Sequence, residues 1–157
     1  MAETDLKCFI SYRRDDLMVV GNVERVYNRL ANRFGPEKVF MDVDSIPPGQ
    51  DFRKVLDESV AQATGLHAVM GPDWSKILKQ RARDPKDFVR IEIESALARG
   101  IPVVPVLLGQ TKMPTARQLP KAIRDFAYCN AGTIDPRRHF DADVERCIAD
   151  LAKHYGK

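Results

Sequence analysis

Glu92 is a carboxylate in an unusual position. Residues 88–99 carry apolar side chains at helical spacing, and at about 100° per residue the following share one face: Val89, Ile93, Ala96 and Leu97. Glu92 falls on this apolar half, whereas Arg90 and Glu94 point away. A carboxylate there loses hydration, and when fixed in place it can stabilise positive charge that develops in a reaction. Two structural alternatives stay open, which are a salt bridge and a carboxylate that reaches past the core to water.

Three other segments hold polar side chains where a parallel sheet would bind a ligand. Residues 11–16, 42–49 and 72–87 each follow a predicted strand, and ligands of such sheets bind beyond the carboxyl ends of the strands. None of the three contains a glycine-rich phosphate fingerprint, so neither a P-loop nor a Rossmann dinucleotide site is predicted. The histidines and cysteines lack metal-ligand spacing, and no metal site is predicted.

The elements that position these residues alternate along the chain. Buried strands are predicted at residues 8–10, 39–41, 66–70 and 101–108, with a short edge strand at 126–128. Helices are predicted at 20–34, at 52–60 with Asp51 as the cap, at 88–99 with Asp87 as the cap, and at 141–155. Residues 76–86 are predicted as loop with a short helix. This order predicts a parallel sheet with right-handed crossovers and helices on both faces.

Composition and charge narrow the class of protein. The 157 residues fit one domain, with 44% hydrophobic and 30% charged residues, and residues 1–157 could be a whole protein or the N-terminal module of a longer one. The net charge of +3 comes from dispersed basic residues, so no direct nucleic-acid binding is predicted. There is no signal-peptide pattern and no apolar run near the ~20 residues of a membrane span. Three distant cysteines are typical of free thiols, and we expect a cytoplasmic protein without membrane contact.

Taken together, four segments resemble the Toll/interleukin-receptor (TIR) domains of bacteria. Residues 9–16, with the sequence Phe-Ile-Ser-Tyr-Arg-Arg-Asp-Asp, resemble the first strand and loop of that family. Residues 39–52 resemble its second strand and long loop, 87–97 the helix of its enzymatic members, and 101–108 its fourth strand. The similarity covers nearly the whole chain, and it implies a flavodoxin-like five-stranded parallel sheet, in agreement with the order of elements above.

The resemblance also implies an activity. Many TIR domains cleave the nicotinamide–ribose bond of NAD+, giving ADP-ribose or a cyclic isomer, and their catalytic glutamate lies four residues after an aromatic residue, usually tryptophan. Here the matching pair is Glu92 and Phe88. NAD+ would be the substrate, with no further cofactor and no metal. The expected biological role is bacterial antiphage immune signalling.

By the same resemblance, the substrate site would include Ser11, Tyr12, Arg13, Asp44, Phe52 and Phe88. Arg13 could contact a phosphate, whereas Phe52 and Phe88 offer stacking surfaces. Hydrogen bonding within loops remains an alternative for Tyr12, Arg13 and Asp44, and Trp74 is expected to pack at a helix start. A homotypic TIR–TIR contact would use the self-association loop, composed of Ser45, Ile46, Pro47, Pro48, Gly49 and Gln50.

Two other functions compete with the enzyme. Some TIR domains act only as interaction modules through the same loop, because a fold does not determine a function. A phosphoacceptor receiver domain shares the strand order, and Asp15-Asp16 imitates its acidic pair. Receivers need an aspartate at the end of the third strand, however, and Met70-Gly71-Pro72 stands there instead, so this alternative is disfavoured.

Overall fold

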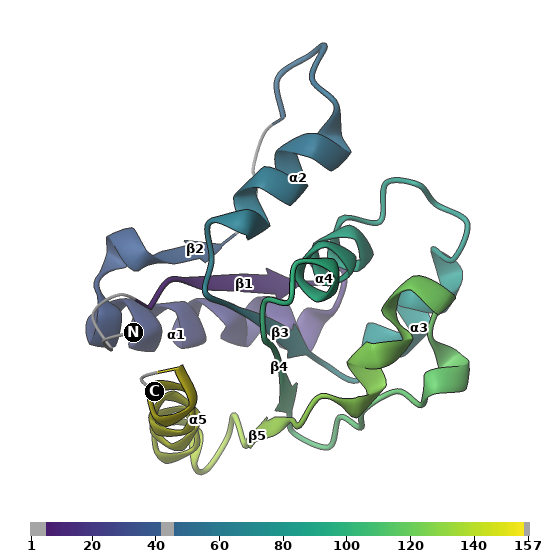
Figure 1. Cartoon of the computed structure of the whole chain (residues 1–157). Helices are drawn as coiled ribbons and strands as arrows, with labels where there is room; N and C mark the ends of the chain where they lie inside the picture. Colours follow the sequence, from purple (N-terminus) through teal and green to yellow (C-terminus); the bar gives the residue numbers. More distant parts are fainter. Residues whose placement is uncertain (1–5, 42–45, 156–157) are drawn as a thin grey trace.

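An all-parallel sheet of five strands organises the protein (Figure 1). The structure is a computed structural model that describes residues 6–41 and 46–155. The strand order is β2-β1-β3-β4-β5, and the bounds are β1 Cys8–Tyr12, β2 Val39–Met41, β3 Gly65–Met70, β4 Val103–Leu108 and β5 Gly132–Ile134. The predicted flavodoxin-like fold, with helices on both faces, is therefore confirmed.

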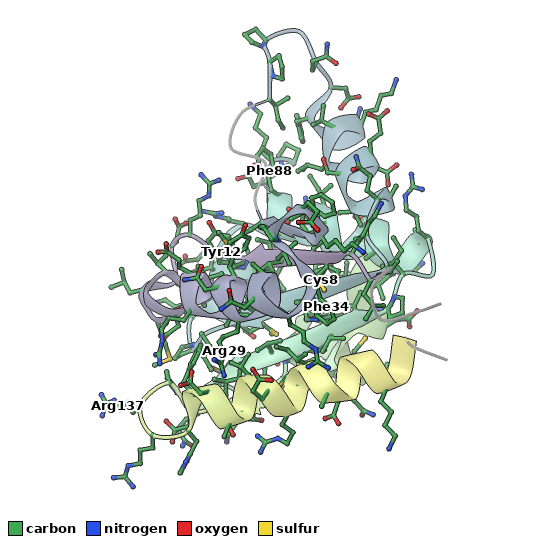
Figure 2. The ribbon with its side chains drawn as sticks, turned by 90° about the vertical axis from the view of Figure 1, so that its left-hand side faces the viewer. Cys8, Tyr12, Arg29, Phe34, Phe88 and Arg137 are labelled. Carbon is green, nitrogen blue, oxygen red and sulfur yellow. The ribbon has the colours of Figure 1, made fainter. Side chains whose placement is uncertain are left out.

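Two hydrophobic cores fill the spaces between the sheet and its helices. Helices α1 (Leu17–Phe34) and α5 (Phe140–Tyr155) pack on one face. Helices α2 (Phe52–Ala61), α3 (Trp74–Gln80) and α4 (Phe88–Ala98) pack on the other. Figure 2 shows α1 and α5 on the same face with Arg29 between them, and the guanidinium of Arg29 lies 3.0 Å from Glu145 of α5.

Strand β1 shows how the sequence directs side chains to these two cores. Cys8 and Ile10 belong to the core under α1 and α5, whereas Phe9 belongs to the core under α2, α3 and α4. Successive side chains of a strand point to opposite faces. Ser11 and Tyr12 must therefore diverge at the end of β1, with Ser11 toward α4 and Tyr12 toward α1.

The predicted strand at 126–128 is wrong. These residues end the 3₁₀ segment η4 (Lys121–Tyr128), and the fifth strand lies further on at Gly132–Ile134. The segment is kinked at Ile123, where the backbone is not helical, and Ile123 and Phe126 are both fully buried. Phe126 packs on Trp74 with ring centroids 5.4 Å apart, so burial of this aromatic favours the helical turn. Two shorter 3₁₀ segments are η2 (Pro36–Lys38) and η3 (Ala116–Gln118).

Other predicted elements agree with the structure to within a few residues. The polar stretch before Asp87 does contain a short helix, α3. Gly100 ends α4 with a φ of +70°, a conformation that glycine adopts without strain. Within residues 6–41 and 46–155, no helix combines the length and the apolar character needed to cross a membrane.

Candidate active site

Ser11 and Glu92 meet between the end of β1 and the middle of α4. The Ser11 hydroxyl donates a hydrogen bond of 2.9 Å to Oε1 of Glu92. Ser11 is 1% exposed and Glu92 is 6% exposed, so the carboxylate lies on the sheet-facing side of α4, as the helical periodicity predicts. Glu94, on the outer side, is exposed. A serine hydroxyl on one oxygen fixes the orientation of the carboxylate.

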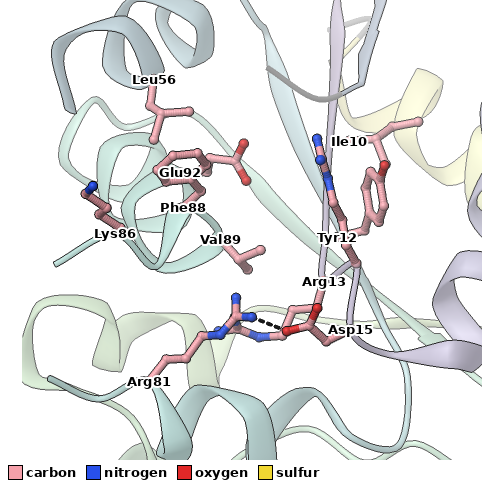
Figure 3. Close-up of a pocket in the computed structure, with 11 residues that line it drawn as sticks. Ile10, Tyr12, Arg13, Asp15, Leu56, Arg81, Lys86, Phe88, Val89 and Glu92 are labelled. Carbon is pink, nitrogen blue, oxygen red and sulfur yellow. Dashed lines mark hydrogen bonds and ion pairs between the residues drawn. The ribbon is translucent and has the colours of Figure 1, made fainter. Parts of the chain in front are cut away.

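The Glu92 carboxylate faces a cleft of about 240 Å³. Figure 3 shows the side chain pointing from α4 toward β1 across this space. The cleft is lined on the β1 side by Ile10, Tyr12, Arg13, Arg14 and Asp15, and on the opposite side by Leu56, Arg81, Lys86, Phe88, Val89 and Glu92. The carboxylate is thus buried at the wall of a cavity rather than inside a closed core.

One phenylalanine ring lines the cleft beside Glu92, and a second phenylalanine ring packs against the first. Phe88 lies one helical turn before Glu92 and lines the cleft. Its ring centroid is 5.8 Å from that of Phe52, with a tilt of 32°. The ammonium group of Lys86 lies 6.0 Å from the Phe52 ring centroid, within the range of a cation–π contact. Phe52 and Phe88 are therefore neighbours, but of these two predicted stacking residues only Phe88 is among the residues that line the cleft.

Arg13 has a partner that the sequence analysis did not assign. Its two terminal nitrogens donate to the two carboxylate oxygens of Asp87, at 2.8 and 3.0 Å, and both side chains have zero exposure. The guanidinium carbon lies 5.1 Å from the ring centroid of Trp74. A phosphate contact by Arg13 would have to break this ion pair. The same pair explains why Asp87, although it precedes α4 as predicted, makes no capping hydrogen bond from its side chain.

The cleft is also bordered by charged residues that were not predicted as site residues. Arg14, Arg81 and Lys86 line it together with Asp15, and Asp15 is ion-paired with Arg81 (Figure 3). Arg81 and Lys86 lie in the polar segment after α3, which folds back over the end of β1. In the sequence, the positive charges of Arg81 and Lys86 do not stand out, because basic residues are dispersed along the whole chain.

A polar clamp holds α2 against α4 and so supports the Leu56 wall of the cleft. Arg99 at the end of α4 donates to both carboxylate oxygens of Asp57, at 3.1 and 2.7 Å, and Ser95 donates to the same carboxylate. Hydrogen bonds from Arg99 and then Ser95 lower the pKa of Asp57 to about 2. Asp57 is therefore ionised throughout the physiological range.

Part of the predicted self-association loop is described. Residues 46–50 precede α2 and stand away from the sheet (Figure 1). Ile46 is partly exposed and Pro47 to Gln50 are exposed. Asp51 accepts a hydrogen bond of 3.0 Å from the backbone of Arg53, so its predicted capping of α2 is confirmed. The predicted site residues Asp44 and Ser45 lie outside the described residues.

The strand order β2-β1-β3-β4-β5 agrees with the fold that the TIR resemblance implies. The sequence model described as "TIR domain" matches residues 8–148. The chain therefore belongs to the TIR domain family.

Similarity to individual proteins agrees with this family. The chain is 30% identical over 131 residues to the NAD(+) hydrolase sarm1 of Drosophila melanogaster. That match covers 83% of this chain and 9% of the relative, so the chain spans less than a tenth of that protein. Two solved structures have similar folds at 15% identity, each with a TM-score of 0.60. They are the TIR domains of the activated Roq1 resistosome, over 95% of this chain and 98% of that one, and a prokaryotic SEFIR domain, over 92% and 90%.

Proposed function

We propose that this domain cleaves the nicotinamide–ribose bond of NAD+, with Glu92 as the catalytic residue. The observation that carries the proposal is a buried carboxylate at the wall of a cleft, oriented by Ser11 and flanked by an aromatic ring. The similarity to a protein named NAD(+) hydrolase supports the substrate.

The chemistry needs few protein groups. When the C–N bond breaks, nicotinamide leaves as a neutral molecule, so no general acid is required. Positive charge then develops on the ribose, and a fixed carboxylate stabilises that charge electrostatically. Ser11 donates to Oε1 of Glu92 and so orients the carboxylate at the wall of the cleft, where it would face the ribose. Water, or a nucleophile within the substrate, then completes a linear or a cyclic product.

The size of the cleft supports a site that is completed by self-association. Pockets that enclose small-molecule ligands measure about 300–1,000 Å³, and this cleft measures about 240 Å³. This cleft alone lies below that range, so a whole dinucleotide would need further surface. A second copy that docks through residues 45–50 would supply the remaining surface. A role in antiphage immune signalling is part of the proposal, and it rests on the family resemblance alone.

The decisive test is Glu92→Gln, which keeps the shape of the side chain and removes its charge. Loss of an electrostatic contact of this kind costs about 10²–10³-fold in rate, so turnover of NAD+ by the purified variant should fall at least that far. Glu94→Gln is the matched control on the exposed side of the same helix and should retain parental turnover. Melting curves must show that both variants are folded. Parental activity in Glu92→Gln would refute the assignment.

The alternative is a domain that only mediates TIR–TIR contacts. Exposure of residues 47–50 on a projecting loop is compatible with it. If the parent chain, held at high concentration by a fused oligomerising tag, releases no nicotinamide from NAD+, then this alternative is favoured.

A further inference from the structure

The Arg13–Asp87 ion pair joins the two elements that carry Ser11 and Glu92. Arg13 follows the end of β1, two residues after Ser11, and Asp87 immediately precedes α4, five residues before Glu92. The pair is bidentate, at 2.8 and 3.0 Å, and links residues 74 positions apart in the sequence. Trp74 at the start of α3 lies against the guanidinium. Three elements thus converge on one buried charge pair.

Stability alone does not account for this arrangement. Both side chains have zero exposure, so both charges have lost their hydration, and well-packed apolar residues are often at least as stable as a buried ion pair. The carboxylate of Asp87 also provides no hydrogen bond to the free amides of α4. In addition, Nε of Arg13 and Nε1 of Trp74 are buried without a hydrogen-bond partner.

A bidentate ion pair fixes the relative orientation of the two groups that form it. The planar guanidinium matches a carboxylate in one orientation, with two parallel hydrogen bonds. It therefore fixes both the distance and the rotation of the α4 N-terminus relative to the end of β1. A shift of α4 along the sheet would strain this pair and would also separate Ser11 from Glu92, because both contacts span the same two elements.

We propose that Arg13 and Asp87 are positioning residues, which set α4 against β1 so that Ser11 holds the Glu92 carboxylate in its reactive orientation. The proposal rests on the proposed NAD+ cleavage for its kinetic consequences, but its geometric claim concerns this chain alone. It also assigns Arg13 to the interior of the domain rather than to a phosphate of the substrate.

The test replaces the pair by apolar residues, Arg13→Met together with Asp87→Leu. Such a double variant should melt at or above the parental temperature, because no buried charge is left without a partner. Its kcat for NAD+ should fall by about 100-fold, the loss that a misplacement of about 1 Å can produce, with little change in KM. In crystal structures of the parent and the variant, the distance from Ser11 Oγ to Glu92 Oε1 should lengthen from 2.9 Å to beyond hydrogen-bonding range.

A second variant covers the case in which the double variant fails to fold. Arg13→Lys keeps the charge and loses the two-pronged geometry, and we expect a folded protein with kcat reduced by about tenfold. Arg29→Lys is the matched control, since Arg29 joins α1 to α5 through Glu145 and neither residue lines the cleft, and it should leave kcat at the parental value.

The outcomes separate this proposal from the proposed function. A stable double variant with parental kcat and an unchanged Ser11–Glu92 distance would overturn the proposal and make the ion pair purely structural, as would parental kcat in Arg13→Lys. If the parent itself cleaves no NAD+, the proposed function fails, and the Ser11–Glu92 distance in the variants still decides whether the pair positions α4.

Discussion

Acidification should destabilise this domain through one buried histidine. His67 lies in the middle of β3, between Ile10 of β1 and Val104 of β4, and is 2% exposed. Neither ring nitrogen has a hydrogen-bond partner. Burial in these surroundings lowers the pKa of His67 from 6.5 to about 4, because the charged imidazolium cannot be hydrated there.

The sign and size of the effect follow from the two pKa values. As the pH falls below 6.5, the unfolded chain binds a proton at His67 while the folded chain does not, so protonation favours unfolding. His67 therefore leaves the free energy of unfolding unchanged above about pH 6.5, and lowers it progressively as the pH falls toward 4. The difference between the two pKa values corresponds to about 3 kcal/mol, a large part of the 5–15 kcal/mol that is typical of a domain.

Urea denaturation between pH 4 and pH 8 measures this loss. Trp74 is the single tryptophan and is buried, so its fluorescence reports unfolding. The control is His67→Leu, which removes two unsatisfied ring nitrogens and should be at least as stable as the parent at pH 7. The other histidines are common to both proteins and cancel in the comparison. The stability that Asp57 contributes is present above its ordinary pKa of 3.8 and is lost only below it, outside this window. Parallel pH profiles for the parent and His67→Leu would refute the reasoning.

Two further predictions concern the proposed activity. Phe88→Ala should lower NAD+ turnover more than Phe88→Trp, because an aromatic surface beside Glu92 can stack on a flat ring; equal turnover in all three proteins, with melting curves recorded in parallel, would reduce Phe88 to a packing residue. Specific activity should rise with protein concentration and be lost in Ile46→Asp, which places a charge in the self-association loop and leaves the fold intact. Ile46→Val, which keeps an apolar side chain at this position, is the matched control and should retain the concentration dependence, whereas a flat activity profile together with an active Ile46→Asp would show that one chain is sufficient.

Periodicity in the sequence predicts most of the fold and the orientation of Glu92. Strong apolar runs predict β1 to β4, and helical spacing on α4 predicts that Glu92 faces inward while Glu94 faces solvent. The fifth strand escaped prediction because Gly132–Ile134 contains a single buried residue, Ile134, and three residues are too few to show an alternation.

The partners of buried polar residues could not be predicted in the same way. Local patterns show that Asp87 precedes a helix, but not that Arg13, 74 positions earlier, takes both of its oxygens. Such a pairing depends on the relative placement of β1 and α4, which is a property of the tertiary structure. The same holds for Lys86 and Arg81, which reach the cleft only because the segment after α3 returns over β1.

The location of the buried polar residues ties the candidate site to the topology of the sheet. In the order β2-β1-β3-β4-β5, the chain leaves β1 toward one neighbour and returns to form the other, so the helix after β1 and the helix after β2 cover opposite faces. Ligands of open parallel sheets bind at such a switch point, beyond the carboxyl ends of the strands. Four of the buried polar residues gather there, namely Ser11, Arg13, Asp87 and Glu92. Each of these side chains loses hydration without adding apolar packing, and their concentration at this switch point is what the proposed active site would require.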